Sequence, residues 1–296
     1  MGGHGRALEL LQDVLHRHRD QKTDAKALVE AVDNALQPLL ADLFASRFFL
    51  DVDACQGVLI DILSCRGFYI ADTYHFEDLR RLGFFRLDGN NAKKRLGCAF
   101  LVFSKLLGQL ARLLGDDGEF EESLARIERA SYDFDELMVF HLQLKTLVYR
   151  NKRVLLSIFH AGTGMERIDS VSVYDAKMRK VVAMNKSNSG GGTLDAIVVD
   201  SSSKELVVGY HNNGEPSKDV IRWHVGPPDE ILDEALYTAE LKKANVVVDS
   251  DVFVLVTTAR VSEEFDLPPC CGLVTGDMFG DYFGPLASLV ELSLEQ

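Results

Sequence analysis

Two polar residues on neighbouring predicted strands have types and spacing that could carry chemistry. The stretch at 189–214, SGGGTLDAIVVDSSSKELVVGYHNNG, predicts a glycine-rich turn, a strand that ends on Asp200, a polar turn and a second strand. Side chains alternate between the faces of a strand, so Asp195 is a polar group at one end of an otherwise apolar face. Pairing of the two strands through the polar turn brings His211 near Asp195. An acid on one strand with polar groups on the next is an arrangement that holds a divalent metal for nucleic-acid cleavage.

The order of predicted elements across 133–258 is a helix, strands, a helix and a strand. This order resembles the PD-(D/E)xK nuclease core, and most of all the nuclease-like domains of retrotransposon hot spot and Crinkler-type proteins. The resemblance implies a restriction-endonuclease-like sheet in which Asp195 is the first acid. Gly209 stands where the second acid or a glutamine would be, and His211 stands where the lysine would be. Without a carboxylate at Gly209 a metal loses a hard oxygen ligand, so the chain departs from the family at its chemistry.

Three interpretations of these strand residues stay open. In the first, Asp195 caps a turn and His211 ends a strand in a purely structural hairpin. In the second, the sheet is a nuclease-like scaffold without catalysis. In the third, Asp195 and His211 serve a divalent-metal nuclease together with Glu136 or Glu205, and Mg²⁺ is then the cofactor. Glu136 also suits a simpler role, because an acid in the first turn of a helix is stabilised by the helix dipole. Apart from the nuclease alternative, we expect no metal site and no cofactor.

A basic segment in the first half offers a binding surface. Cations surround Phe84 and Phe85 in RRLGFFRLDGNNAKKRLG: Arg80, Arg81, Arg86, Lys93, Lys94 and Arg95. Cations interleaved with aromatic rings suit a phosphate backbone with stacked bases. They also suit a protein partner, because arginine and exposed aromatic residues are enriched at interface hot spots. A solvated helix face with buried phenylalanines is the third reading.

A second binding surface is predicted in the C-terminal run FDLPPCCGLVTGDMFGDYFGPLASLVEL, which has few charges and carries Phe279 and Phe283. A run this apolar either packs onto the sheet or meets a partner. Both alternatives stay open, and Phe279 and Phe283 are the residues that separate them.

Composition limits the class of protein. The chain has 296 residues, of which 47% are hydrophobic and 26% charged, as in a folded globular protein. Its formal net charge of −13 opposes wholesale wrapping of nucleic acid or binding to an anionic membrane. The five cysteines are odd in number and lack zinc-ligand spacing, which favours a reducing intracellular compartment, cytoplasm or nucleus, with an organelle left open. MGGHGRALEL lacks a signal-peptide core, and Lys105 and Arg112 interrupt the most apolar stretch, so we expect no membrane attachment.

The elements that position these residues fall into two classes. Apolar residues at helical spacing predict that 1–150 is helical, with helices at 7–19 and 23–46. Capping residues predict where three further helices begin: at Asp53, at Asn90 or Asn91 for a helix that ends at Gly115, and at Asp133 with Glu136. Over 151–296 short β-rich runs alternate with turns. A helix predicted over 227–244 joins the strands at 205–211 and 251–258, and such a crossover indicates parallel strands in a mixed sheet.

The sequence therefore predicts an α+β protein with an N-terminal helical domain, 1–150, and a mixed-sheet α/β domain, 151–296. We expect a non-catalytic structural or regulatory subunit of an intracellular protein or ribonucleoprotein complex. A protein partner is the main expectation, and nucleic acid would bind through the N-terminal basic segment. The alternatives are a divalent-metal-dependent nuclease and a nucleic-acid-binding module without catalysis.

Overall fold

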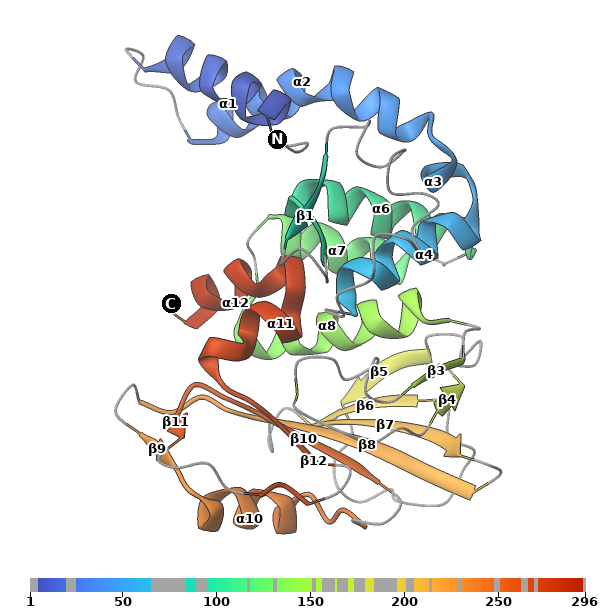
Figure 1. Ribbon diagram of the computed structural model, residues 1–296, viewed down its shortest axis with the longest axis vertical. Helices are drawn as coiled ribbons and strands as arrows, with labels where there is room; N and C mark the ends of the chain where they lie inside the picture. The colour runs from blue at the N-terminus through green and yellow to red at the C-terminus, as the bar shows by residue number, and fades with distance from the viewer. Residues whose placement is uncertain are drawn as a thin grey trace. The chain divides into compact units, whose positions relative to one another are not determined.

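The computed structural model in Figure 1 is an α+β fold in which contacts divide the chain into two compact units. Unit 1 is Met1–Ile62 with Arg66–Glu122, and unit 2 is Leu63–Cys65 with Ser123–Gln296. The structure describes residues 5–19, 25–64, 84–88, 95–115, 118–129, 132–150, 153–155, 163, 170–172, 179–183, 196–200, 205–212, 215–227, 230–247, 251–261, 266–268 and 271–294.

Unit 1 is helical with one small hairpin. Its elements are α1 (Gly5–His18), α2 (Ala25–Phe44), α3 (Arg47–Leu50), α4 (Val52–Leu63), the antiparallel strands β1 (Phe85–Asp88) and β2 (Arg95–Cys98), and α6 (Phe100–Leu113). Leu59 of α4 and Phe103 and Leu106 of α6 are fully buried. The Cys55 thiol lies 3.5 Å from the carbonyl oxygen of Leu106, so α4 and α6 are in direct contact. Apolar burial of this kind is the main stabilisation of short helices.

Two boundaries predicted for unit 1 are wrong. The Asp51 carboxylate accepts the N–H of Ala54 at 2.8 Å, so Asp51 and not Asp53 caps α4. The helix predicted from Asn90 or Asn91 begins only at Phe100, because residues 95–98 pair with β1 as a strand. Gly97 lies in that strand opposite Arg86, and a glycine inside a helix would cost about 1 kcal/mol.

Unit 2 is built on a six-stranded mixed sheet in the order β12-β10-β8-β7-β6-β5. β6, β7 and β8 are antiparallel neighbours, whereas β8, β10 and β12 run parallel, as do β5 and β6, so the mixed sheet is confirmed. The strands are β5 (Arg179–Ala183), β6 (Ala196–Asp200), β7 (Glu205–Asn212), β8 (Glu215–His224), β10 (Val252–Thr257) and β12 (Cys271–Val274).

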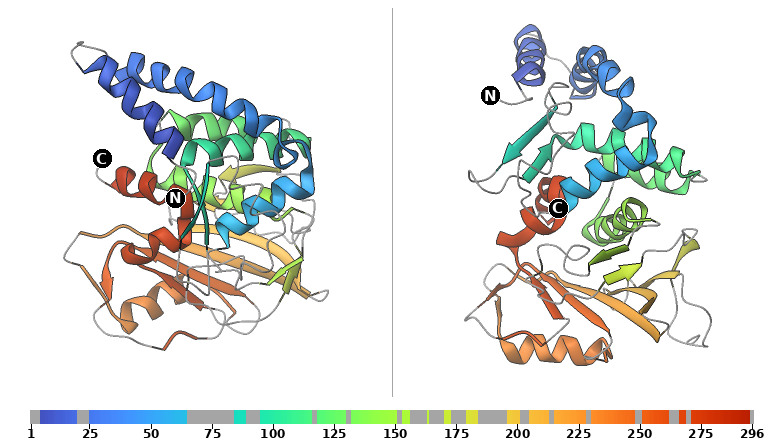
Figure 2. Two further views of the ribbon diagram at one scale, coloured as in Figure 1. Left: turned by 45° about the horizontal axis from the view of Figure 1, so that its top comes forward. Right: turned by 45° about the vertical axis from the view of Figure 1, so that its right-hand side comes forward.

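The other elements of unit 2 are helices and two small ribbons. Figures 1 and 2 show α10 on one face of the sheet and α8 on the other. The ribbons pair β3 (Arg153–Leu155) with β4 (Ser170–Ser172), and β9 (Ile231–Leu232) with β11 (Arg260–Val261). The helices are α7 (Glu119–Glu128), which begins in unit 1, α8 (Phe134–Val148), α10 (Glu234–Lys243), η2 (Gly276–Met278), α11 (Phe279–Phe283), η3 (Gly284–Leu286) and α12 (Ala287–Leu294).

The predicted crossover exists, but it leaves from a strand that the sequence did not reveal. β8, α10 and β10 form the crossover, whereas the prediction started it from the strand at 205–211. The helix within it begins at Glu234 and not at 227, because Ile231 and Leu232 pair with β11 and Asp233 caps α10. α8 belongs to compact unit 2, whereas the prediction included its residues in the N-terminal domain. Compact units defined by contacts are not folding domains, so the domain boundary at residue 150 stays a prediction.

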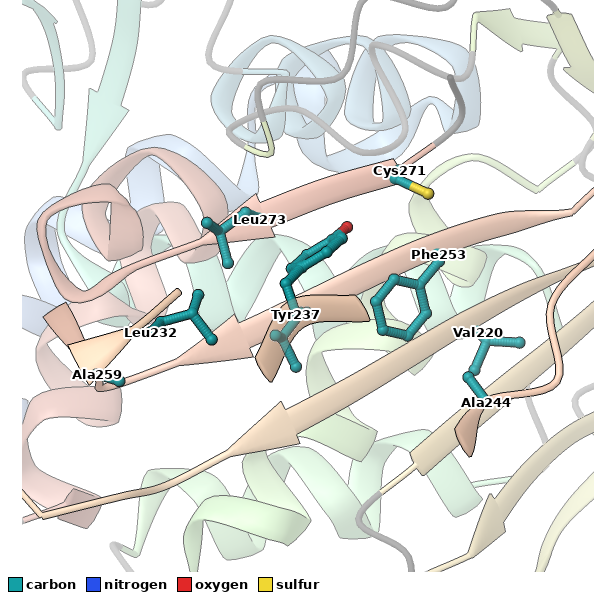
Figure 3. Packing of buried hydrophobic residues seen from close by; sticks show 9 residues of the cluster. Val220, Leu232, Tyr237, Ala244, Phe253, Ala259, Cys271 and Leu273 are labelled. Carbon is teal, nitrogen blue, oxygen red and sulfur yellow. The ribbon is translucent and has the colours of Figure 1, made fainter. Parts of the chain in front are cut away.

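The core under α10 is apolar and closely packed (Figure 3). Tyr237 of α10 meets Phe253 of β10 edge to face at 5.7 Å and donates its hydroxyl hydrogen to the carbonyl of Gly272 on β12 at 3.2 Å. Burying one such side chain contributes about 1.5–3 kcal/mol. The buried members of the cluster are Val220, Leu232, Tyr237, Ala244, Phe253, Leu255, Ala259, Cys271 and Leu273. Within the described parts of the chain, no helix has the length and apolarity needed to cross a membrane.

Candidate functional site

The strand residues predicted to carry chemistry are only partly described. β6 and β7 pair antiparallel as predicted, with Ile197 opposite Val208. His211 lies on β7 opposite Pro216 of β8, and Asp195 falls outside the described residues. Glu205 registers with Asp200 on one side and with Arg222 on the other. A metal role for Asp195 with His211 therefore stays a prediction. Among the described residues, no three or more His, Cys, Asp or Glu side chains are grouped to hold a metal.

Glu136 has a structural role at the start of α8. The Asp133 carboxylate accepts the N–H of Glu136 at 2.8 Å, and the Asp133 N–H donates to Glu136 Oε2 at 3.3 Å. This reciprocal capping box is confirmed as predicted. Arg126 of α7 also forms an ion pair with Glu136.

The basic segment lies on the β1–β2 hairpin where it is described. Arg86 is an exposed residue of β1, and Arg95 opens β2 opposite Asp88. Phe84 and Phe85 are 4% and 0% exposed, as in the reading with buried phenylalanines. Their burial keeps both rings from stacking on bases. Arg80, Arg81, Lys93 and Lys94 lie outside the described residues, and the binding role of the segment stays a prediction.

Phe279 and Phe283, the other predicted binding residues, are buried in unit 2 with exposures of 3% and 0%. Their rings meet edge to face at 5.4 Å on α11. This is the arrangement that the packing alternative expects. A partner could contact these two rings only if α11 moved, so their role in binding stays a prediction.

Buried titratable groups lie together where α8 meets α11. We define the α8–α11 cluster as His141 and Lys145 of α8 with Tyr282 and Phe283 of α11. The His141 ring lies 4.9 Å from the Tyr282 ring and 4.8 Å from the Phe283 ring. Lys145 Nζ lies 4.3 Å from the centre of the Tyr282 ring, and a desolvated cation–π contact contributes about 2 kcal/mol. Polar groups thus help hold α11 on α8.

The electrostatics of this cluster keep its two rings neutral. Burial, followed by the nearby Lys145 charge, holds the pKa of His141 well below its ordinary value. Burial, followed by the charge of Asp219 on β8, raises the pKa of Tyr282 above its ordinary value. His141 Nε2 makes no hydrogen bond within the described parts of the chain. The charged group of the cluster, Lys145, therefore lies beside the neutral rings of His141 and Tyr282.

Sequence reasoning assigned no site role to His141, Lys145 or Tyr282. A signal for Lys145 existed, because His141, Lys145 and Tyr149 recur every four residues and so share one helix face. The flanking residues Leu137, Leu144 and Leu147 are all buried, which extends the apolar surroundings of that face. No local pattern could show that Tyr282 meets it.

A second polar group lies at the carboxyl ends of β8 and β10. His224 Nε2 lies 2.8 Å from Glu230 Oε2, and both side chains are about one-third exposed. The N–H of Gly226 donates to Thr258 Oγ1 at 3.1 Å, which joins the ends of the two parallel strands. A Cβ at Gly226 would lie 1.5 Å from Glu230 Oε2, so a larger residue there would force the Glu230 carboxylate to shift. A carboxylate beside an imidazole fixes its orientation for hydrogen bonding or proton transfer.

The described cysteines of unit 1 are reduced and unreactive. Burial, followed by the charge of Asp51, raises the pKa of Cys55 to about 12. Burial also raises the pKa of Cys98 to about 12, against the opposing effect of Arg86. Cys55, Cys98 and Cys271 are free thiols. At neutral pH the thiols of Cys55 and Cys98 stay protonated and are poor nucleophiles.

A mixed sheet with α10 on one face and α8 on the other gives this chain an α+β architecture (Figure 1). The chain is 35% identical to Crinkler effector protein 108 of Phytophthora sojae over 323 aligned residues, which cover 97% of this chain. This similarity supports a Crinkler-type family. The chain spans 38% of the length of that relative. No family model matches the chain, and no solved structure matches it.

Proposed function

We propose that this chain is an intracellular effector module that acts by binding a protein partner, as a non-catalytic structural or regulatory component of a complex. The observation that carries the proposal is the similarity to a protein named as an effector, which extends over 97% of the chain. The similarity runs through both compact units, so both belong to the proposed module.

The paired charges of unit 2 support a binding role. Arg222 of β8 and Glu240 of α10 form a buried ion pair at 3.0 Å, and Lys243 adds a second contact to Glu240. The indole N–H of Trp223 donates to Asp135 of α8 at 2.6 Å. These side chains hold α8 and α10 to the sheet on which a binding surface would be presented.

The test is purification of the tagged chain at moderate salt after nuclease treatment, followed by quantification of the proteins that stay bound. We expect a protein partner in constant stoichiometry that rebinds to the purified chain with a measurable dissociation constant. Charge reversal at Arg86 is the first variant for mapping the surface, because Arg86 is exposed. A chain that stays monomeric and recovers no stoichiometric partner would contradict the proposal.

A divalent-metal-dependent nuclease is the second candidate. The order α8, β6 to β8, α10 and β10 supports it, because this is the order of the core that the resemblance implies. The chemistry would need Asp195 with His211 and Glu136 or Glu205 around Mg²⁺. Glu136 would then have to leave its capping box.

The nuclease candidate is tested by incubating the chain with labelled DNA and RNA with and without Mg²⁺. The matched variants are Asp195→Asn and Asp200→Asn, which remove one carboxylate at either end of the same predicted strand. Mg²⁺-dependent cleavage that is lost only in Asp195→Asn would establish the nuclease and displace the binding proposal. Equal cleavage by both variants would remove Asp195 from the site.

A further inference from the structure

The helices that follow β12 form one segment, 276–294, which packs on α8 within unit 2 (Figure 1). This segment contains only helices, so its departure from α8 would break no strand pairing of the sheet. Gly276 follows β12 after Thr275, and a Cβ at Gly276 would meet no atom within 4 Å. A glycine with open surroundings at the end of an element can absorb backbone rotation. The segment therefore has a site for a hinge where it leaves the sheet.

Aromatic contacts hold the 276–294 segment on α8. The His141 ring lies 4.9 Å from the Tyr282 ring and 4.8 Å from the Phe283 ring. These three side chains are 2%, 3% and 0% exposed. Further along the segment, the Tyr132 hydroxyl donates to the carbonyl of Leu289 at 3.3 Å. His141 is thus buried against the rings of the segment that it helps to hold.

Protonation of His141 would place a second cation in this buried contact. Lys145 lies one turn further along the same face of α8, with Nζ 4.3 Å from the centre of the Tyr282 ring. Asp219 of β8 is a further charged group of this neighbourhood, and its charge acts on Tyr282. The hydration that a buried imidazolium loses exceeds the attraction that two aromatic rings return. Burial, followed by the Lys145 charge, accordingly holds the pKa of His141 well below its ordinary value.

We propose that His141 is a pH-sensitive contact: uptake of a proton by its ring releases the 276–294 segment from α8 and exposes Phe279, Tyr282 and Phe283, while the sheet stays folded. Water solvates the imidazolium in the released state but not in the docked state, so the proton favours release. The docked state keeps its full advantage above the ordinary pKa of 6.5 and loses it progressively as the pH falls below that value. This inference is independent of the proposed protein-binding function.

Hydrogen exchange followed by mass spectrometry measures release of the segment in the full chain at pH 7.5 and pH 5.5. After correction for intrinsic exchange rates, the amide protection of 276–294 should fall about tenfold between these pH values, because one group titrates with its ordinary pKa in the released state only. The amides of α10 and β10 should keep their protection. Protection that stays unchanged in the segment, or that falls equally in β10, would overturn the proposal.

Three variants test the residue assignment. His141→Phe and His141→Leu remove the titrating group but keep an apolar side chain against the segment, so protection of 276–294 should be the same at both pH values. His224→Gln is the matched control, because it removes the histidine at the end of β8 but keeps a hydrogen-bonding side chain beside Glu230. This variant should retain the tenfold loss. A loss that persists in both His141 variants, or that disappears in His224→Gln, would show that another group causes the release.

Discussion

Among single residues, Arg222 and Glu240 form a buried ion pair whose contribution to stability can be measured by substitution. Its side chains are 11% and 8% exposed. Burial alone would raise the pKa of Glu240, but Lys243 and Arg222 outweigh burial and lower it. Replacing Glu240 with Gln removes one charge of the buried pair and takes this carboxylate away from the Arg222 guanidinium. We expect a loss of about 3–5 kcal/mol in the free energy of unfolding, measured by urea titration with circular dichroism.

The control for Glu240→Gln is the double variant Arg222→Met with Glu240→Leu. Removing both charges together leaves no buried ion without a partner, so this variant should recover most of the lost stability. A double variant that is less stable than Glu240→Gln would show that the pair itself stabilises the fold.

His141 should make the stability of unit 2 depend on pH. Its pKa in the folded chain lies well below the ordinary value of 6.5, so the unfolded chain binds the proton first as the pH falls. The free energy of unfolding should therefore decrease below about pH 6.5, by up to about 1.4 kcal/mol per pH unit from this residue. Urea titrations at pH 7.5 and pH 5.5 measure the difference.

The matched variant is His141→Phe, which keeps an aromatic ring beside Tyr282 and Phe283 but cannot take up a proton. Its stability should change less between the two pH values than that of the parent chain. The same change in both chains would mean that other groups cause the acid sensitivity.

At the scale of elements, the caps decide where the helices begin. Asp233 accepts the N–H of Leu236 at 2.8 Å and is exposed, so its bond serves mainly α10. Asp233→Ala should lower the free energy of unfolding by about 1 kcal/mol, whereas Asp233→Asn should cost much less, because asparagine caps almost as well. Thermal unfolding compares the two variants, and equal losses would show that the charge matters rather than the cap.

Local patterns sufficed for the elements whose determinants are close in sequence. The capping box of Asp133 with Glu136 and the short apolar runs of β6 and β7 are visible within a few residues. β8 was not predicted, because Lys218, Asp219 and Arg222 interrupt its apolar pattern. Arg222 is tolerated there because Glu240 of α10 forms an ion pair with it in the folded chain.

The same distinction applies to the candidate sites. The spacing of His141 and Lys145 can be seen in the sequence, but their contact with Tyr282 joins segments that are far apart. The hairpin of β1 and β2 was missed for a related reason, since β2 has little apolar alternation and is fixed by its pairing with β1. Contacts between residues far apart in the sequence leave no local pattern, so they cannot be predicted from one sequence.

At the scale of the whole molecule, a net charge of −13 opposes general attraction to nucleic acid. Any binding should therefore depend on a local basic surface. If the chain binds RNA, charge reversal at Lys93, Lys94 and Arg95 should weaken binding and flatten its salt dependence. The slope should fall by roughly one for each phosphate group that the variant no longer neutralises. Filter binding at several salt concentrations measures this slope.

The control for this prediction is charge reversal at Lys242 and Lys243 of α10, which lie outside the basic segment. Because Lys243 contacts Glu240, the single variant Lys242→Glu is the control that leaves this contact intact. Affinity that falls equally in both sets of variants would indicate unspecific attraction, and affinity unchanged by the reversal at 93–95 would exclude the segment.

The chain contains one tryptophan, Trp223, which is 3% exposed and bonded to Asp135 within unit 2. Its fluorescence therefore reports on unit 2 alone. A shift of the emission to longer wavelength indicates that this indole has become exposed to water. Unfolding confined to unit 1 would leave the tryptophan emission unchanged. The loss of its helices would still reduce the far-ultraviolet circular dichroism signal. Coincident transitions from the two signals would mean that both units melt together.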